Sequence, residues 1–211
     1  MAPSLADDEY QKALAEAAQF GANLKTINTN EMDNPLYVQN DSQRCYFCKN
    51  ELFSQLNKLA KQFKIKYIIE GSNTDDLNDY RPGLNAAREF KIRSPFVESG
   101  LSKNEIRKLS KFLGLKTWDK PSQPCLSSRV AYGVPIDEKK LANIYKAELI
   151  LKNLKFKVVR VRHYHDFVSI EVEKDELDRL LTPNMKKTIK NKFESIGLNN
   201  IKFDPEGYQS G

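Results

Sequence analysis

The sequence is poor in cysteine, histidine, glycine and tryptophan, and it has no long apolar run. Its 211 residues include 3 Cys, 2 His, 9 Gly, 9 Pro and 1 Trp. This composition excludes a fibrous, low-complexity or disulfide-dense protein. The longest apolar stretches, such as residues 67–69, are far too short to span a bilayer. A chain of this length buries roughly 70% of its unfolded surface, so it needs no disulfides to fold as one or two domains.

The first ten residues, MAPSLADDEY, carry acid and no apolar segment, so no signal peptide is visible. We therefore expect a soluble, cytoplasmic protein with no membrane partner. Lys and Arg exceed Asp and Glu by 34 − 28 = 6. A basic balance suits anionic partners, either nucleic acid or phosphorylated small molecules. The lysines are spread without a run of five or six, which is more typical of a solvated surface.

Helical and extended patterns alternate in residues 1–115. Apolar spacing predicts helices over 7–20 and about 47–63, and short apolar runs predict strands over 24–28, 65–69 and 92–96. Ser102 and Glu105 form a capping box before a further helix, and Gly114 stands where that helix should end. This alternation predicts an α/β domain with a parallel sheet.

Residues 116–135 are rich in proline and hydroxyl side chains, which indicates a functional loop or linker. Residues 136–211 then predict a smaller α+β domain. Asp137 should cap a long helix, two runs of period two at 157–165 and 166–174 should form a hairpin, Pro183 should begin another helix, and 201–204 should close the chain as a strand.

The 3 cysteines occur in settings that favour a nucleophilic or metal-binding role. Cys45 and Cys48 form a C-x-x-C at a predicted helix start, flanked by Arg44 and Lys49, and Cys125 lies in the Pro-rich loop. Positive charge and a helix N-terminus favour thiolates, the nucleophilic and metal-binding form. A zinc site usually needs four protein ligands, whereas three thiolates leave one position open on a four-iron cluster. The alternative is that these are ordinary buried cysteines.

Two other groups of charged residues are candidates for phosphate or metal binding. The loop EGSNTDDLNDYRPG, residues 70–83, follows a predicted parallel strand, where ligands of α/β sheets bind. Its carboxylates suit Mg²⁺ and its arginine suits phosphate, although a solvated acidic turn explains it equally well. These residues are Asp75, Asp76, Asp79 and Arg81.

The run VRVR places Arg160 and Arg162 on one face of a strand, as a clamp for phosphate or carboxylate. Glu171 on the next strand and Glu148 on the preceding helix suggest either a metal site or ion pairs, of which ion pairs are the commoner.

Together these motifs resemble the LarE family, ATP-dependent sulfur transferases of the PP-loop superfamily that help to build the nickel-pincer nucleotide of lactate racemase. The resemblance runs along nearly the whole chain, through RCYFCK, DDLNDYRPG, KPSQPCLSSR, the VRVR strand and the terminal PEGYQSG. It implies a Rossmann-like fold of the adenine nucleotide alpha hydrolase type. It also implies a pyridinium mononucleotide substrate, whose adenylated carboxylate is attacked by sulfur.

The resemblance assigns roles to particular residues. Some family members sacrifice the sulfur of one cysteine, whose position matches Cys125. Others hold a [4Fe–4S] cluster on three cysteines that match Cys45, Cys48 and Cys125. The remaining implied contacts are cofactor- and substrate-binding by Ser128, Arg129, Arg160 and Arg162, ATP and Mg²⁺ binding near the 70–83 loop, and metal binding by Glu148 and Glu171.

One family feature is missing from these 211 residues. The superfamily's Ser-Gly-Gly-x-Asp-Ser loop cradles pyrophosphate, and this sequence contains no Gly-Gly dipeptide. The parallel sheet is therefore expected to lack its first βαβ unit, and the chain as given is expected to adenylate poorly or not at all. A missing N-terminal half, or a homo-oligomer, is the corresponding expectation for a partner.

Two other functions fit some of the same residues. A tRNA thiolase of the same superfamily would use the basic surface, but the sequence shows no appended RNA-binding motif, and a nucleic-acid partner is not expected. A binding module without catalysis would keep the substrate and cluster sites alone.

Overall fold

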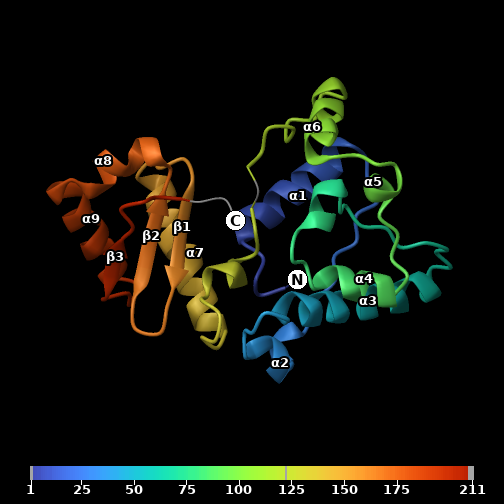
Figure 1. Cartoon of the computed structure of the whole chain (residues 1–211), viewed down its shortest axis with the longest axis horizontal. Helices are drawn as coiled ribbons and strands as arrows, with labels where there is room; N and C mark the ends of the chain where they lie inside the picture. The colour runs from blue at the N-terminus through green and yellow to red at the C-terminus, as the bar shows by residue number, and fades with distance from the viewer. Residues whose placement is uncertain (1, 122, 209–211) are drawn as a thin grey trace. The chain divides into compact units, whose positions relative to one another are not determined.

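The computed structural model describes residues 2–121 and 123–208, which form two compact units (Figure 1). Unit 1 consists of residues 1–26, 38–40 and 124–211, and unit 2 of residues 27–37 and 41–123. The division at 123/124 falls inside the Pro-rich segment 116–135. Residues 209–211 of the motif PEGYQSG, and Ser122 of KPSQPCLSSR, lie outside the described residues.

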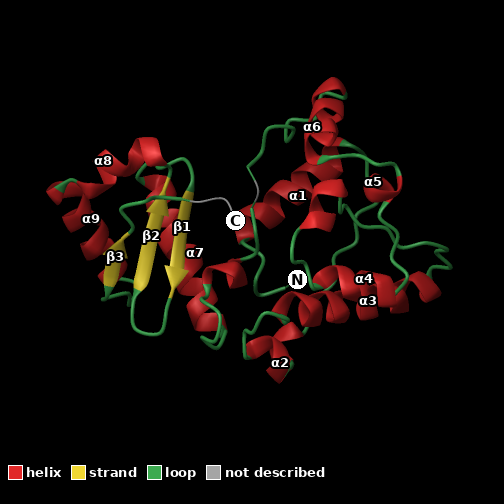
Figure 2. Ribbon diagram, viewed as in Figure 1, coloured by secondary structure: helices red, strands yellow, loops and turns green. Residues whose placement is uncertain are grey.

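Unit 1 is a small sheet covered by helices (Figure 2). The strands are β1 (Val159–His163), β2 (Val168–Val172) and β3 (Ile201–Phe203), in the order β1-β2-β3. β1 and β2 form the predicted antiparallel hairpin, and β3 pairs parallel to β2. The helices are α1 (Asp7–Gln19), α7 (Glu138–Asn153), α8 (Leu177–Leu181) and α9 (Pro183–Glu194).

The period of two in β1 and β2 separates an apolar face from a charged face. Val161 and Ile170 are fully buried in a core completed by α7, α8 and α9. Arg160, Arg162 and Glu171 project from the opposite face of the same strands. The fold thus places the predicted arginine pair on one surface of the sheet.

Helix α1 is joined to the rest of unit 1 by an ion pair between two residues that are far apart in the sequence. Lys152 Nζ lies 3.0 Å from the carboxylate of Asp8. Burial alone would raise the pKa of Asp8, but hydrogen bonds and charge from Lys152 and Lys12 outweigh it and lower that pKa. The first residues therefore fold with the C-terminal part of the chain, which local sequence patterns do not indicate.

Unit 2 is helical, with its small core between two helices that lie side by side (Figure 1). Its helices are α2 (Pro35–Val38), α3 (Arg44–Gln62), α4 (Gly83–Glu89), α5 (Pro95–Glu98) and α6 (Lys103–Phe112), with 3-10 turns η1 (Glu31–Asp33) and η2 (Thr74–Asn78). Phe53 of α3 packs against Ala86 and Ala87 of α4. The short side chains of the two alanines let the helices approach closely.

Several predicted helix boundaries are confirmed by their caps. The Ser102–Glu105 capping box is present, and Gly114 has φ +72° just beyond α6. The Asp137 side chain accepts a hydrogen bond from the Lys140 N–H at 2.7 Å, and Pro183 is the first residue of α9. These local signals need no tertiary information.

The three strands predicted in residues 1–115 are wrong for the described chain. Residues 24–28 are irregular, 65–69 contribute one parallel bridge from Ile69 to Arg93, and Pro95 begins helix α5 inside 92–96. A strand becomes regular when neighbours pair along it, and a single bridge fixes only one residue. The helix-rich, mixed composition agrees with the α/β class, while the Rossmann-like parallel sheet stays a prediction.

None of the helices in the described residues combines the length and the apolar composition needed to cross a bilayer.

Candidate functional site

Cys125 stands on a fixed loop in unit 1. It is exposed and immediately precedes the 3-10 turn η3 (Leu126–Arg129). The Leu126 N–H donates to the carbonyl of Ser4 at 2.8 Å, and the Ser128 hydroxyl donates to the carbonyl of Cys125 at 2.7 Å. Arg129 Nη1 donates to the same Cys125 carbonyl at 3.0 Å, and also to that of Pro124. The thiol is therefore accessible while its backbone is held on both sides.

Asn40 holds the segment that follows η3. Its fully buried side-chain Nδ2 donates to the carbonyls of Ala131 and Val134 at 2.9 and 2.8 Å, and Val130 accepts at 3.3 Å. Asn40 has φ +59°, a left-handed conformation that asparagine tolerates better than most residues. Sequence analysis missed this residue, because an isolated asparagine after a short helix carries no distinctive pattern.

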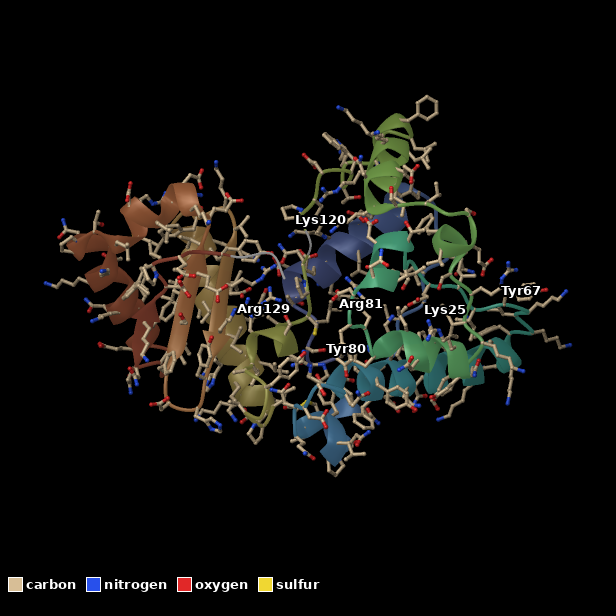
Figure 3. The ribbon with its side chains drawn as sticks, viewed as in Figure 1. Lys25, Tyr67, Tyr80, Arg81, Lys120 and Arg129 are labelled. Atoms are coloured by element: carbon tan, nitrogen blue, oxygen red, sulfur yellow. The ribbon has the colours of Figure 1, made fainter. Side chains whose placement is uncertain are left out.

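Arg129 and Glu148 form a buried ion pair (Arg129 is labelled in Figure 3). Their side chains are 2% and 6% exposed, and Nε–Oε1 and Nη2–Oε2 distances of 3.0 and 3.4 Å make the contact bidentate. Glu148 Oε1 also accepts from the Val161 N–H at 3.2 Å. This carboxylate, which the resemblance places at a metal, thus joins helix α7, strand β1 and the Cys125 loop.

Arg160 and Arg162 share one face of β1, as predicted, but differ in environment. Arg160 is 4% exposed, and its guanidinium carbon lies 5.0 Å from the ring centroid of Tyr208. Burial, together with the neighbouring charge of Arg129, lowers the pKa of Arg160. Arg162 is 36% exposed and pairs with Glu171, the second carboxylate assigned to a metal. Three arginines therefore face two glutamates, and the excess positive charge suits an anionic ligand.

Cys45 and Cys48 lie in the first turns of α3 in unit 2. Residues three apart share a helix face, so the two thiols project from the same side. Cys45 is exposed and Cys48 is partly buried. A Cβ atom at Gly83 would lie 3.0 Å from Lys49 Cγ and 3.5 Å from the Cys45 carbonyl, so a larger residue at this approach of α4 to α3 would require the Lys49 side chain to shift.

The charged side chains of the 70–83 loop are engaged with one another. Arg81 pairs with Asp76 at 2.9 Å and with Asp79 at 3.2 Å. Asp75 Oδ2 accepts from the Lys103 N–H at 3.1 Å, and Asp76 completes a capping box with Asn73. The Arg81 side chain remains 50% exposed, so its outer face is accessible to a ligand.

Glu70, which sequence analysis did not single out, lies at the centre of a polar cluster. Lys49 Nζ is 3.0 Å from its carboxylate, and the hydroxyls of Ser94, at 3.2 Å, and Ser72 donate to it. Burial would raise the pKa of Glu70, but these hydrogen bonds outweigh it and leave that pKa below its ordinary value. The only sequence signal was a glutamate directly after an apolar run and before Gly-Ser.

Among the described residues, no group of three or more His, Cys, Asp or Glu side chains is arranged to hold a metal ion. The assignments of metal and cluster ligands stay predictions.

Comparison with known proteins decides the family. No family model matches the sequence. An uncharacterised protein of Synechocystis is 42% identical over 211 residues, which is 100% of this chain and 79% of that protein. The pyridinium-3,5-bisthiocarboxylic acid mononucleotide synthase of Lactiplantibacillus plantarum, LarE, is 31% identical over 205 residues, or 97% of this chain and 74% of the synthase. The chain belongs to the LarE family.

A third relative also matches nearly the whole chain. An uncharacterised protein of Methanocaldococcus jannaschii is 31% identical over 208 residues, which is 99% of this chain and 79% of that protein. The matches to all three relatives cover both units, so the Cys125 loop and the C-x-x-C helix lie within the shared region.

Proposed function

We propose that this LarE-family chain is a sulfur transferase that thiolates a carboxylate of pyridinium-3,5-biscarboxylate mononucleotide, a step of nickel-pincer nucleotide biosynthesis. The observation that carries the proposal is the match to the Lactiplantibacillus synthase over 97% of the chain. The exposed thiol of Cys125, on its anchored loop, supports it with a nucleophile.

In the sacrificial form of the reaction, Cys125 supplies the sulfur. Its thiolate attacks the acyl carbon of the adenylated carboxylate, a C–S bond forms, and AMP leaves with the electrons of the C–O bond. The Cα proton of Cys125 then passes to solvent as the Cβ–S bond breaks. A thiocarboxylate product and a dehydroalanine remain. Ser128 and Arg129 keep the cysteine backbone in place through both steps.

A [4Fe–4S] cluster is the alternative sulfur source. Three thiolates are the number that leaves one iron of such a cluster open, and the proposed ligands are Cys45 and Cys48, which share one helix face, and Cys125. Such a cluster, when bound, supplies a sulfide in place of the cysteine sulfur.

The charged residues receive binding roles in this proposal. Arg162, partly exposed beside the buried Arg160, is the proposed contact for the phosphate of the mononucleotide. The exposed guanidinium of Arg81 and the carboxylates Asp75, Asp76 and Asp79 form the proposed ATP and Mg²⁺ region. A metal at Glu148 or Glu171 would have to displace the arginine that now pairs with each carboxylate.

The test separates activation from sulfur transfer. Reduced protein, purified without oxygen, is given either the mononucleotide with Mg-ATP or the chemically adenylated mononucleotide, and products are followed by mass spectrometry. We expect the adenylate to gain sulfur, whether or not the chain also activates the mononucleotide with ATP. No product from the adenylate under any condition would refute the proposal.

Matched cysteine variants identify the sulfur source. If Cys125 is sacrificed, Cys125→Ser abolishes transfer, Cys45→Ser retains it, and the spent protein loses the mass of H₂S. If a cluster delivers the sulfide, both variants lose transfer together with bound iron and acid-labile sulfide.

A further inference from the structure

The segment that follows β3 runs across to the end of strand β2 (Figure 1). The Asp204 N–H donates to the Ile170 carbonyl at 3.0 Å. The Tyr208 N–H donates to the Val172 carbonyl at 2.7 Å. Between them the Glu206 N–H donates to the Asp204 carboxylate at 2.9 Å, as in an Asx turn. Contacts within unit 1 therefore fix the backbone of Tyr208, which belongs to the motif PEGYQSG and has no role in the proposed function.

The turn requires a glycine directly before Tyr208. Gly207 has φ +73°, and a Cβ atom there would lie 2.8 Å from the Val172 carbonyl oxygen and 3.3 Å from a methyl group of Leu177. A side chain at this position would overlap the backbone of β2, and glycine alone adopts this left-handed conformation at little cost. The local sequence thus serves to place Tyr208 against the sheet.

The Tyr208 side chain faces both arginines of the VRVR run. Its ring centroid lies 5.0 Å from the guanidinium carbon of Arg160. Burial and the charge of Arg129 lower the pKa of Arg160, and a side-chain hydrogen bond with Tyr208 partly offsets them. Burial would also lower the pKa of Arg162, but Glu171 raises it, and Tyr208 adds to that effect. The phenol oxygen is therefore close to both guanidinium groups.

The hydroxyl proton of Tyr208 is available to a ligand. A phenol has one O–H donor, and a phenol oxygen that accepts from a guanidinium directs its own proton away from that group. Among residues 2–121 and 123–208, none accepts this proton. An anion held by Arg162 would be an acceptor at the right place, because phosphate oxygens accept from guanidinium and hydroxyl donors together.

We infer that Tyr208 is a further substrate-contacting residue, whose hydroxyl donates a hydrogen bond to the phosphate of the mononucleotide at Arg162 while Arg160 holds the phenol ring. The inference rests on the proposed function, because it takes the substrate of that function as the ligand. The hydroxyl adds a donor without adding charge. Tyr208 therefore favours the mononucleotide over the corresponding nucleoside, which has no phosphate to accept the bond.

The test compares two ligands on matched variants. Isothermal titration calorimetry measures binding of pyridinium-3,5-biscarboxylate mononucleotide, and of the nucleoside that a phosphatase makes from it, to the whole chain. Tyr208→Phe keeps the ring beside Arg160 and removes only the donor. It should bind the mononucleotide about tenfold more weakly and the nucleoside equally well. The control Tyr145→Phe removes a hydroxyl from helix α7 of the same unit and should bind both ligands as the unmodified chain does.

The outcomes separate this inference from the proposed function. Unchanged mononucleotide binding in Tyr208→Phe, or an equal loss for both ligands, would overturn the role of Tyr208 while leaving the proposed function in place. No binding of the mononucleotide by the unmodified chain would contradict both. Gly207→Ala, which displaces the turn, should reduce mononucleotide binding at least as much as Tyr208→Phe, and full retention in this variant would also overturn the inference.

Discussion

Arg129 is the residue on which the Cys125 loop most depends. Its donors reach the Glu148 carboxylate, the carbonyls of Pro124 and Cys125, and the Ser128 hydroxyl. Sequence analysis could include Arg129 only as part of the motif KPSQPCLSSR. Its partner Glu148 is 19 residues away on a helix, and no local spacing rule connects a loop arginine to that carboxylate.

Replacement of Arg129 by methionine should destabilise unit 1 by about 3–5 kcal/mol, because it leaves the Glu148 carboxylate buried without a counter-ion. The double variant Arg129→Met/Glu148→Gln should recover more than about 1 kcal/mol of that loss, since the buried charge is removed as well. Urea unfolding of both single variants and the double variant measures the coupling. Strictly additive changes in the free energy of unfolding would show that Arg129 and Glu148 have no interaction energy.

Glu70 should make the free energy of unfolding depend on pH in the acidic range. Its folded-state pKa is lowered, so its contribution is fully present above the unfolded-state pKa and is lost as the pH falls through the folded-state value. Glu70→Gln should therefore cost about 1–2 kcal/mol at neutral pH, and the difference from the unmodified chain should shrink as the pH falls below about 4. Denaturant unfolding at several pH values checks this. A pH-independent difference would contradict the prediction.

At the scale of single elements, helix ends were predictable and unit 2 strands were not. A cap such as Asp137 depends on a side chain and an N–H three residues apart, so the sequence contains both partners. Residues 65–69 have the composition of a strand, but a strand also needs paired neighbours, and among the described residues only Arg93 is bridged to them. The β1–β2 hairpin was predicted correctly because its two strands are adjacent in sequence.

The Asp137 cap gives a direct test at this scale. Asp137→Ala should destabilise unit 1 by about 1 kcal/mol, because the Lys140 N–H loses its acceptor. Asp137→Asn keeps an oxygen at the same place and should lose only part of that amount. Thermal unfolding of the two variants side by side measures the difference, and equal losses would mean that charge, not the hydrogen bond, is what matters.

At the scale of the whole molecule, the two units have very different cores. In the described residues, unit 1 buries a large cluster that includes Leu151, Val161, Ile170 and Phe193, whereas the cluster of unit 2 consists of Phe53, Ala86 and Ala87 with partly buried neighbours. Sequence analysis predicted two parts but not this contrast. The number of apolar side chains buried in unit 2 depends on which of its surfaces other elements cover. The composition of the sequence does not reveal this.

Unequal cores should give unequal local stability. Amide hydrogens of α3 and α4 should exchange markedly faster than those of β1 and β2, because few buried apolar contacts resist local opening in unit 2. Hydrogen exchange followed by mass spectrometry on the whole chain tests this. Uniform protection of both units would refute the contrast.

The buried side-chain amide of Asn40 is a position at which deamidation would damage the native structure. Its amide nitrogen is shared among three carbonyls, so loss of that nitrogen as ammonia would put carboxylate oxygens against carbonyl oxygens in a fully buried position. Asparagine is among the thermolabile residues. In the native state the Asn40 side chain is buried and hydrogen-bonded. Deamidation of Asn40 would therefore leave a carboxylate that cannot make the hydrogen bonds to the carbonyls of Val130, Ala131 and Val134.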